Sequence, residues 1–254
     1  MLRKLDTTVF KQMAQIEDRH WWCRARREIL ATAIERFSTR SAASRIRLAE
    51  VGCGSGGNLP MLATFGRVLG TEPDVATVDY LRRTRGEAFE VICQPVPAPL
   101  PGKFHVIAMF DVLEHIEDDR GALAWVSDHL EPGGIVVLSV PAFRFLWTEQ
   151  DEAAHHFRRY TPDELVNVVP ESLTIEHVSC FNTLLFPAIL AVRTAMQLRR
   201  RKNRPPKTHL GIPPEPFNWL FYRIFRLERH FVCRLRFNLG VSILLVARRR
   251  LAPA

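Results

Sequence analysis

The sequence predicts an α/β protein built on an open, mainly parallel β-sheet. Seven short apolar runs alternate with segments of helical spacing over most of the chain, which is typical of such sheets. A glycine-rich turn directly follows the first run, as in proteins that bind a nucleotide-like cofactor at the edge of a sheet. With 254 residues, of which 47% are hydrophobic and 24% charged, the chain favours one domain with an insertion over two domains.

The strands and helices follow one another in the order that a wound sheet requires. Strands are expected at 46–51, 67–71, 89–93, 104–110, 135–140, 173–181 and 240–247. Helices are expected at 7–36, 74–84, 119–130 and 161–168, the first capped by Asp6 or Thr7 and the last by Thr161 before Pro162. These elements divide the chain into an N-terminal helical cap (1–44), a sheet domain (45–182 and 237–254) and a basic amphipathic helical insertion (183–236).

The glycine-rich turn contains four glycines in six positions, at Gly52, Gly54, Gly56 and Gly57. Glycine loses more backbone freedom on folding than any other residue, so such a turn needs a reason. The usual reason is that backbone N–H groups and a helix N-terminus, here near Asn58, approach a ligand closely. The turn therefore predicts a nucleotide-like cofactor.

Two cofactor classes fit these glycines. Gly52, Gly54 and Gly57 satisfy the G-x-G-x-x-G pattern of dinucleotide-binding proteins, and Glu72 lies 20 residues after Gly52, where an acid that binds ribose is expected. The stretch Glu50-Val-Gly52-Cys-Gly54-Ser-Gly56 equally resembles the first motif of the class I S-adenosylmethionine-dependent methyltransferases, which carry an acid two residues before the first glycine. The glycines alone do not separate the two classes.

Further stretches resemble the same methyltransferase family, in order and at fitting distances. They are Glu72 at the end of the second strand, 104–118 with its Leu-Glu-His, the Pro-Gly-Gly turn of 130–134, and the loop 147–165 with His-x-Arg-Arg-Tyr. The N-terminal His20-Trp21-Trp22 has a counterpart in one branch of the family. The resemblance implies a Rossmann-like seven-stranded sheet, mainly parallel with an antiparallel last strand, a helical insertion before that strand, and S-adenosyl-L-methionine as cofactor.

The resemblance also implies which residues bind the cofactor. Glu72 matches the acid that accepts both ribose hydroxyls, and Glu50 would orient the turn or the ammonium end. Many relatives have an acid for adenine where this chain has Val96, so adenine recognition would depend on backbone groups or on Gln94. The predicted cofactor residues are Glu50, Gly52, Cys53, Gly54, Gly56, Asn58, Glu72, Pro73, Val96, Phe110, Asp111 and Val112.

Methyl transfer from a sulfonium is an in-line displacement, so positioning supplies much of the catalysis. A hydroxyl acceptor also benefits from a base, for which His156 is the first candidate, with Tyr160 beside it and His115 in reserve. The predicted acceptor-binding residues are Trp22, Trp147, Arg158 and Arg159. The alternative is that Asp151, His156 and Arg159 form a structural cluster, and that Asp111, Glu114 and His115 only begin a helix.

The positive charge is concentrated near the C-terminus. Residues 193–250 contain 15 Lys and Arg against two Glu, a net charge of +13, so the rest of the chain carries −5 of the total +8. This asymmetry indicates an anionic partner, and because the arginines alternate with aliphatic side chains a membrane surface is favoured over nucleic acid. The apolar stretch 184–198 is shorter than the ~20 residues that span a bilayer, so an interfacial helix or packing against the protein or a second copy is expected.

The five cysteines are scattered and contain no C-x-x-C pair, which argues for a reducing compartment and against a zinc site; no metal ion is expected. Together with the absence of an apolar segment after Met1, this predicts a cytoplasmic protein, peripherally membrane-bound if the insertion binds lipid. The predicted function is O-methylation of a small or lipid-linked acceptor. The alternatives are an NAD(P)-type oxidoreductase and a catalytically silent, cofactor-binding membrane adaptor, and the acceptor and oligomeric state are not predicted.

Overall fold

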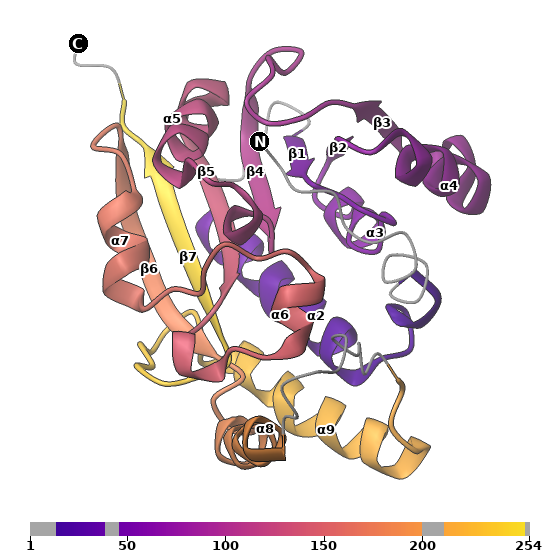
Figure 1. Ribbon diagram of the computed structural model, residues 1–254. Helices are drawn as coiled ribbons and strands as arrows, with labels where there is room; N and C mark the ends of the chain where they lie inside the picture. Colours follow the sequence, from indigo (N-terminus) through magenta and orange to yellow (C-terminus); the bar gives the residue numbers. More distant parts are fainter. Residues whose placement is uncertain (1–13, 39–45, 200–210, 252–254) are drawn as a thin grey trace.

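A single seven-stranded sheet runs through the protein in the order β3-β2-β1-β4-β5-β7-β6 (Figure 1). This computed structural model describes residues 14–38, 46–199 and 211–251. Every neighbouring pair of strands is parallel except for β7, which runs antiparallel to both β5 and β6. The predicted fold class is confirmed. The strands are β1 Arg47–Val51, β2 Arg67–Glu72, β3 Glu90–Cys93, β4 Phe104–Phe110, β5 Leu130–Pro141, β6 Leu173–Phe181 and β7 Ser242–Arg249.

Helices cover both faces of the sheet. The described α-helices are α2 Trp21–Phe37, α3 Leu59–Ala63, α4 Val75–Arg85, α5 Asp119–His129, α6 Glu149–Ala153, α7 Pro162–Val168, α8 Phe186–Arg199 and α9 Glu215–Leu227. Short 3-10 turns lie at Gly86–Ala88, Leu113–His115, Arg144–Leu146 and Glu228–His230. The helix predicted at 161–168 begins as expected, since the Thr161 side chain accepts a hydrogen bond from the Glu164 N–H.

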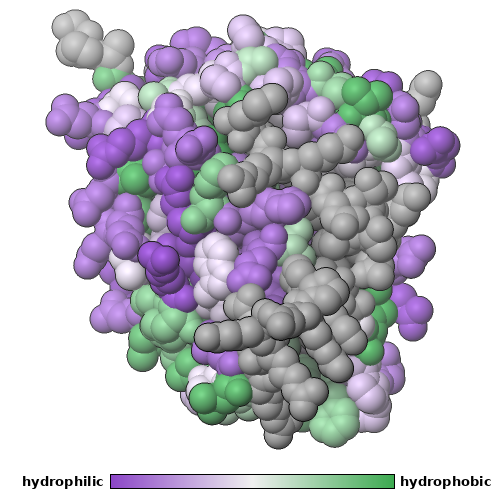
Figure 2. Space-filling view, in the orientation of Figure 1, coloured by the Kyte–Doolittle hydropathy of each residue, from purple (hydrophilic) through white to green (hydrophobic). Residues whose placement is uncertain are grey.

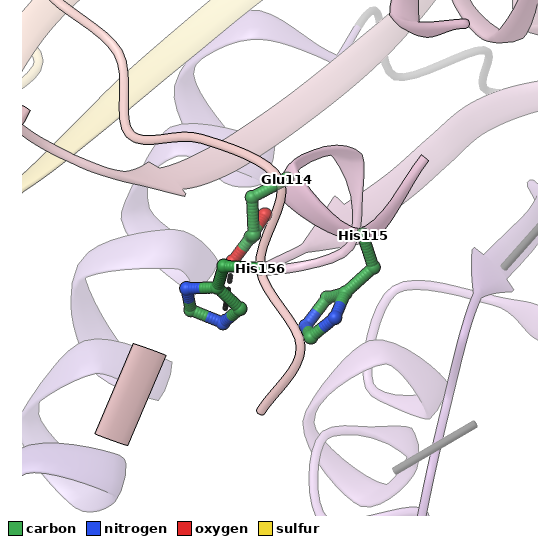
Figure 3. Close-up of side chains that lie close together, drawn as sticks. All are labelled: Glu114, His115 and His156. Carbon is green, nitrogen blue, oxygen red and sulfur yellow. Dashed lines mark ion pairs between the residues drawn. The ribbon is translucent and has the colours of Figure 1, made fainter. Parts of the chain in front are cut away.

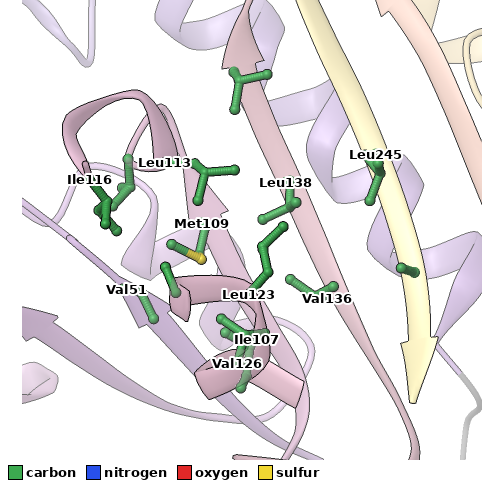
Figure 4. Close-up of a cluster of buried hydrophobic side chains, with 14 of the residues drawn as sticks. Val51, Ile107, Met109, Leu113, Ile116, Leu123, Val126, Val136, Leu138 and Leu245 are labelled. Carbon is green, nitrogen blue, oxygen red and sulfur yellow. The ribbon is translucent and has the colours of Figure 1, made fainter. Parts of the chain in front are cut away.

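The core has two halves because alternate strand residues point to opposite faces. On one face Ile107 of β4 and Leu138 of β5 pack with Leu123 and Val126 of α5 (Figure 4). On the other face the intervening strand residues pack against helices α2, α3, α4 and α9. The central strands are buried on both faces, which explains why their sequences are continuously apolar rather than alternating.

The predicted N-terminal helix is interrupted: residues 14–16 are helical, residues 17–19 form a turn, and a new helix follows. Of the expected helix 7–36, residues 7–13 and the proposed caps Asp6 and Thr7 lie outside the described residues, and the chain turns before α2 starts at Trp21. His20 causes this start, because its backbone is extended and its side chain accepts a hydrogen bond from the Trp22 N–H at 3.2 Å. The two tryptophans therefore stand in the first turn of a new helix.

Within the predicted helical insertion (183–236) the described helices are α8 and α9, and α9 ends at Leu227. Glu228 turns inward at this point and is fully buried, where its carboxylate accepts hydrogen bonds from the backbone N–H groups of Asn182 and Leu184. The chain beyond it forms a 3-10 turn and loops before β7. Glu228 thus joins the end of α9 to the end of β6.

Helix α9 of the insertion packs directly on α2. Trp21 contacts Phe221 and Phe225 with ring centroids 5.6 and 5.9 Å apart. The Asn218 side chain, also from α9, accepts from the Trp21 N–H at 2.9 Å and donates to the Arg19 carbonyl at 3.1 Å. The N-terminal segment and the insertion thus lie side by side at the lower end of the sheet in Figure 1.

Candidate active site

The glycine-rich turn after β1 has a backbone that only glycine adopts easily. Gly52, Gly54 and Gly56 have φ angles of +68°, +54° and +77°. A Cβ atom at Gly52 would lie 2.8 Å from the Val112 side chain, so the turn packs tightly on that side. A Cβ atom at Gly54 would meet nothing within 4 Å. The turn therefore leaves open space beside Gly54, where a ligand can approach the backbone.

Glu72, at the end of β2, faces this turn. One carboxylate oxygen accepts a hydrogen bond from the Gly54 N–H at 3.1 Å, and the other accepts from the Asp74 N–H at 3.2 Å. Burial raises the pKa of this carboxyl, and the two N–H donors oppose that shift. The structure thus brings the glycines and the acid together across one space, as the sequence motifs predict for a ribose-binding carboxylate.

Glu50 lies buried beneath the turn and offers an oxygen without a partner. Its Oε1 accepts a hydrogen bond from the Asn58 side chain at 2.7 Å, whereas Oε2 has no partner among the described residues. Burial raises the pKa of Glu50 to about 8. A buried, half-satisfied carboxylate suits an ammonium group as ligand, so the site fits the amino-acid end of the predicted cofactor. The expected helix after Asn58 is only the five-residue α3, so its dipole is small.

The other predicted cofactor residues support the site in different ways. Cys53 and Val96 are buried, and the Gln94 side chain donates to the Pro99 carbonyl, which leaves the backbone as the stronger candidate for binding adenine.

Phe110 ends β4 and lines a pocket next to the glycine-rich turn. Asp111 follows it with φ +57° and pairs with the buried guanidinium of Arg26 from α2. Pro73 follows Glu72 in the sequence. The Val112 side chain packs beside Gly52.

A pocket of about 500 Å³ opens next to Asn58 and Asp111. Trp21 and Trp22 of α2 line it, together with residues of the loop after β5. The insertion contributes Ile189 and Arg193 of α8. The Arg26 guanidinium lies 4.7 Å above the Trp22 ring, which fixes that tryptophan beside the pocket. The pocket therefore combines aromatic and aliphatic side chains with many polar and charged groups, which come from α2, the turn after β4 and the loop after β5.

Asp151 organises the loop that forms the polar side. Arg159 donates to both of its carboxylate oxygens, at 2.8 and 3.0 Å, and His156 Nδ1 lies 2.9 Å from Oδ1. The Thr148 N–H adds a further bond at 2.8 Å and begins α6. Burial disfavours the charge of Asp151, but the hydrogen bond with His156 and the Arg159 guanidinium outweigh burial and hold the pKa well below its usual range.

His156 meets Glu114 and His115 at the wall of the pocket (Figure 3). Its Nε2 lies 4.0 Å from Glu114 Oε1, and its ring stands edge-on to that of His115, with centroids 4.6 Å apart. Glu114 and His115 come from the 3-10 turn after β4, where His115 Nδ1 and both Glu114 oxygens lack partners among the described residues. Burial raises the pKa of Glu114 to about 8, and burial followed by His156 lowers that of His115 to about 3.

The sequence matches the profile of the methyltransferase domain family over residues 22–178. That match covers more than half of the chain. The protein belongs to the methyltransferase domain family. The resemblance deduced from the motifs and the predicted enzyme class are thus confirmed, and the oxidoreductase alternative is set aside.

Known relatives of this methyltransferase differ in how much they resemble it. The juvenile hormone acid O-methyltransferase of Drosophila melanogaster is 30% identical over 99 residues, which span 34% of this chain and 33% of that protein. Among solved structures, a chain of the Haloferax volcanii complex between the Trm112 activator and a methyltransferase has a TM-score of 0.58 and 15% identity, covering 97% of this chain and 96% of its own. The plantazolicin methyltransferase BpumL, solved with S-adenosylhomocysteine, has a TM-score of 0.56 and 10% identity, covering 95% of each chain.

Several predicted acceptor-side residues do not line the pocket of the methyltransferase. Tyr160 is buried and donates to Asp119 at 2.9 Å; burial and Asp119 raise its pKa far above the usual value. Arg158 also donates to Asp119, at 2.6 Å. Arg159 reaches the pocket, but its donors are used by Asp151 and the Ala142 carbonyl. Trp147 stands 6.4 Å from the His156 ring, outside the pocket lining.

Three residues stand out among those of the pocket that the sequence did not predict. Arg26 pairs with Asp111, and Asn182 is a fully buried amide without hydrogen-bond partners for its side chain among the described residues. Arg193 donates to the Leu146 carbonyl at 2.5 Å, and burial lowers its pKa to about 10. A signal existed for Arg193, because it is the only charged residue within 184–198.

Proposed function

We propose that this methyltransferase transfers the methyl group of S-adenosylmethionine to an oxygen atom of a small amphipathic acceptor. The observation that carries the proposal is the continuity between the cofactor side and the pocket. Asn58 and Asp111, next to the glycine-rich turn, line the same pocket as Glu114 and His156. A methyl group delivered from the turn would therefore enter the pocket close to its polar wall.

The cofactor side supplies a separate contact for each part of S-adenosylmethionine. The Gly54 region leaves room for close approach, Glu72 would accept the ribose hydroxyls, and the free oxygen of Glu50 would accept the ammonium group. These groups hold the cofactor without taking part in bond making. The chemical step is a displacement at the methyl carbon, so alignment of the acceptor oxygen with the sulfonium is the main catalytic requirement.

The pocket walls indicate what kind of acceptor fits. The aromatic wall of Trp21 and Trp22 would cover an apolar body. Arg193 also lines the pocket and forms no ion pair with a described carboxylate, which favours an acceptor that also carries an anionic group. The Drosophila relative is named for O-methylation of an acid, which supports oxygen as the accepting atom.

His156 is the residue that we expect to meet the acceptor hydroxyl. Asp151 occupies its Nδ1 atom, so Nε2 is directed toward Glu114 and the pocket. A carboxylate that orients an imidazole in this way keeps the second nitrogen available to accept a proton. The neighbouring arginine, Arg159, supports this arrangement by fixing Asp151.

The insertion supports a second proposal, that the enzyme works at an anionic membrane surface. Val192, Met196 and Leu198 of α8 and Phe217 and Trp219 of α9 are all exposed, and arginines lie between them. Figure 2 shows apolar side chains at the lower edge of the molecule, where α8 and α9 lie in Figure 1. None of the described helices has the length and apolarity needed to cross a bilayer. Sedimentation with anionic liposomes at low salt tests this proposal, and full recovery in the supernatant would refute it.

Transfer of a labelled methyl group tests the main function. The protein is incubated with S-adenosylmethionine carrying a tritiated methyl group and with a metabolite extract, and the labelled product is isolated. Release of labelled methanol by alkali indicates a methyl ester, whereas an alkali-stable product is analysed for an ether. Label on nitrogen or carbon would contradict the proposal. Binding of S-adenosylhomocysteine without any transfer would instead favour a silent adaptor.

A further inference from the structure

We propose that Glu114, His115 and His156 together bind a divalent metal ion such as Zn²⁺. The catalytic meaning of the site rests on the proposed function, whereas the binding itself does not. Two imidazoles and one carboxylate form a ligand set that first-row transition metals prefer, and three protein ligands leave a position open for substrate. The scattered cysteines argue against a zinc site, but this ligand set contains no cysteine.

The geometry of the three side chains suits one ion. One ligand atom from each residue lies within 4.8 Å of the other two. The centre of a triangle of this size is about 2.8 Å from each corner, compared with about 2.0–2.2 Å for bonds from zinc to nitrogen or oxygen. Shifts of less than about 1 Å in each side chain would therefore complete the coordination. Figure 3 shows the three side chains converging from the turn after β4 and from the loop before α7.

Two of the three proposed ligands have atoms without hydrogen-bond partners. Glu114 is fully buried, and neither of its oxygens has a hydrogen bond from a described residue; His115 Nδ1 is equally without a partner. Burying a carboxylate alone is costly, so a cation is the natural compensation. The nearby guanidinium groups do not form an ion pair with Glu114, because Arg26 pairs with Asp111 and Arg159 with Asp151. These orphaned atoms are an observation independent of the spacing.

The surroundings of His156 match those of a metal-binding imidazole. Asp151 lies 2.9 Å from Nδ1 and leaves Nε2 facing Glu114. Such a carboxylate–histidine pair fixes the tautomer and raises the basicity of the ligand nitrogen in many metal sites. Arg159 holds Asp151 through two hydrogen bonds, so the pair is rigid. The structure thus contains both the ligands and the groups that would orient them.

An ion at this position would act on the acceptor. Glu114 and His156 line the pocket, so an open coordination position would face the acceptor oxygen. A bound cation lowers the pKa of a coordinated hydroxyl and orients it for the displacement. In this arrangement His156 is a metal ligand and not the proton acceptor that the sequence predicts. Both roles require His156 for activity, so only a binding measurement separates them.

The experiment is a metal titration of the full chain. The protein is treated with a chelator, dialysed, and titrated with Zn²⁺ by calorimetry and with Co²⁺ by visible absorption. We expect one ion per chain and the absorption bands of four- or five-coordinate Co²⁺ with nitrogen ligands. The variants E114Q and H115N should bind at least about 100-fold more weakly, beyond the roughly 10–100-fold cost of losing an outer-sphere partner.

His155 provides a matched control for H115N. It is exposed, it lies beside His156, and its φ of +58° is one that asparagine tolerates. H155N should therefore bind the metal like the wild type. Circular dichroism and titration with S-adenosylhomocysteine, done without metal, report whether each variant is folded and binds cofactor. Failure of that cofactor titration in the wild type would count against the proposed function alone.

Two outcomes would overturn the metal proposal. One is a wild-type protein that binds neither Zn²⁺ nor Co²⁺. The other is a wild type that binds an ion while E114Q and H115N, both folded, bind it equally well, because the ion would then lie elsewhere.

Discussion

The cofactor side and the acceptor side of this methyltransferase are built in different ways. The cofactor side uses a glycine-rich backbone turn and acids from adjacent strands, Glu50 on β1 and Glu72 on β2. The acceptor pocket combines α2, the loop after β5 and α8 of the insertion, which are far apart in the sequence. The residues of the cofactor side are thus close together in the sequence and include a backbone turn. The acceptor pocket is formed by side chains from segments that are far apart in the sequence. Variants on each side should therefore have separable effects on cofactor binding and on turnover.

The largest expected effect on turnover is that of H156A. Because we propose that His156 activates the acceptor, as a base or as a metal ligand, kcat should fall by roughly 10²–10⁴-fold, the range for loss of acid–base or equivalent activation. Affinity for S-adenosylhomocysteine should stay within about twofold, since His156 does not contact the glycine-rich turn. Steady-state kinetics with the acceptor found by methyl labelling, and calorimetry, measure the two quantities. H155A is the control, and a raised KM with unchanged kcat would contradict a role in activation.

The next largest effect is on stability, in D151N. Losing this buried carboxylate leaves the Arg159 guanidinium unpaired, so the free energy of unfolding should fall by about 3–5 kcal/mol. The folded pKa of Asp151 is depressed, so its contribution is fully present above the unfolded value of about 3.9 and is lost as pH falls further. Urea unfolding at about pH 7 and about pH 3 should therefore show a difference between wild type and variant that shrinks in acid. An equal difference at both pH values would contradict this account.

On the cofactor side, E72Q should weaken binding without affecting the pocket. Replacing a charged acceptor of hydrogen bonds by a neutral one costs about 1.5–3 kcal/mol, or roughly 10–100-fold in affinity for S-adenosylhomocysteine. Glu90 on the neighbouring β3 is an exposed acid that pairs with Arg67, so E90Q is the matched control. Equal affinities for E72Q and E90Q would mean that the ribose lies elsewhere.

The smallest effect is expected for Y160F. The Tyr160 hydroxyl bonds Asp119, which keeps its contact with Arg158, so the free energy of unfolding should fall by only about 1 kcal/mol. Because the hydroxyl is outside the pocket, kcat should stay within about twofold of the wild-type value. Thermal unfolding and steady-state kinetics test both statements. A large loss of kcat would restore the catalytic role that the sequence predicts for this residue.

The sequence predicted the sheet well because local patterns determine it. All seven strands overlap the apolar runs that predict them, although β5 already begins at Leu130, and the positive φ angles of the glycine-rich turn require the glycines that reveal it. The start of α2 and the end of α9 were not predicted because single side chains set them. His20 caps one helix through a local bond that histidine rarely makes, and Glu228 ends the other through a contact 46 residues away in the sequence.

The acceptor side was predicted less completely because its residues act through distant partners. His156 and Asp151 are close in sequence and were considered together, but their approach to Glu114 depends on how β4 and β5 pair. Tyr160 and Arg158 were expected near the acceptor because they adjoin His156. Both side chains instead donate hydrogen bonds to Asp119, about 40 residues earlier in the chain, and no local sequence pattern reveals that contact.

Helix α2 is attached on two sides through adjacent residues, which constrains recombination between such enzymes. Arg27 donates to the Gly57 carbonyl at 2.7 Å, while Glu28, the next residue, pairs with Arg226 of α9 at 2.7 Å. Neighbouring side chains thus connect the glycine-rich turn with the insertion. In a chimera, segment 183–236 and the helix corresponding to α2 should therefore be taken together from the same methyltransferase, because the two segments contact each other.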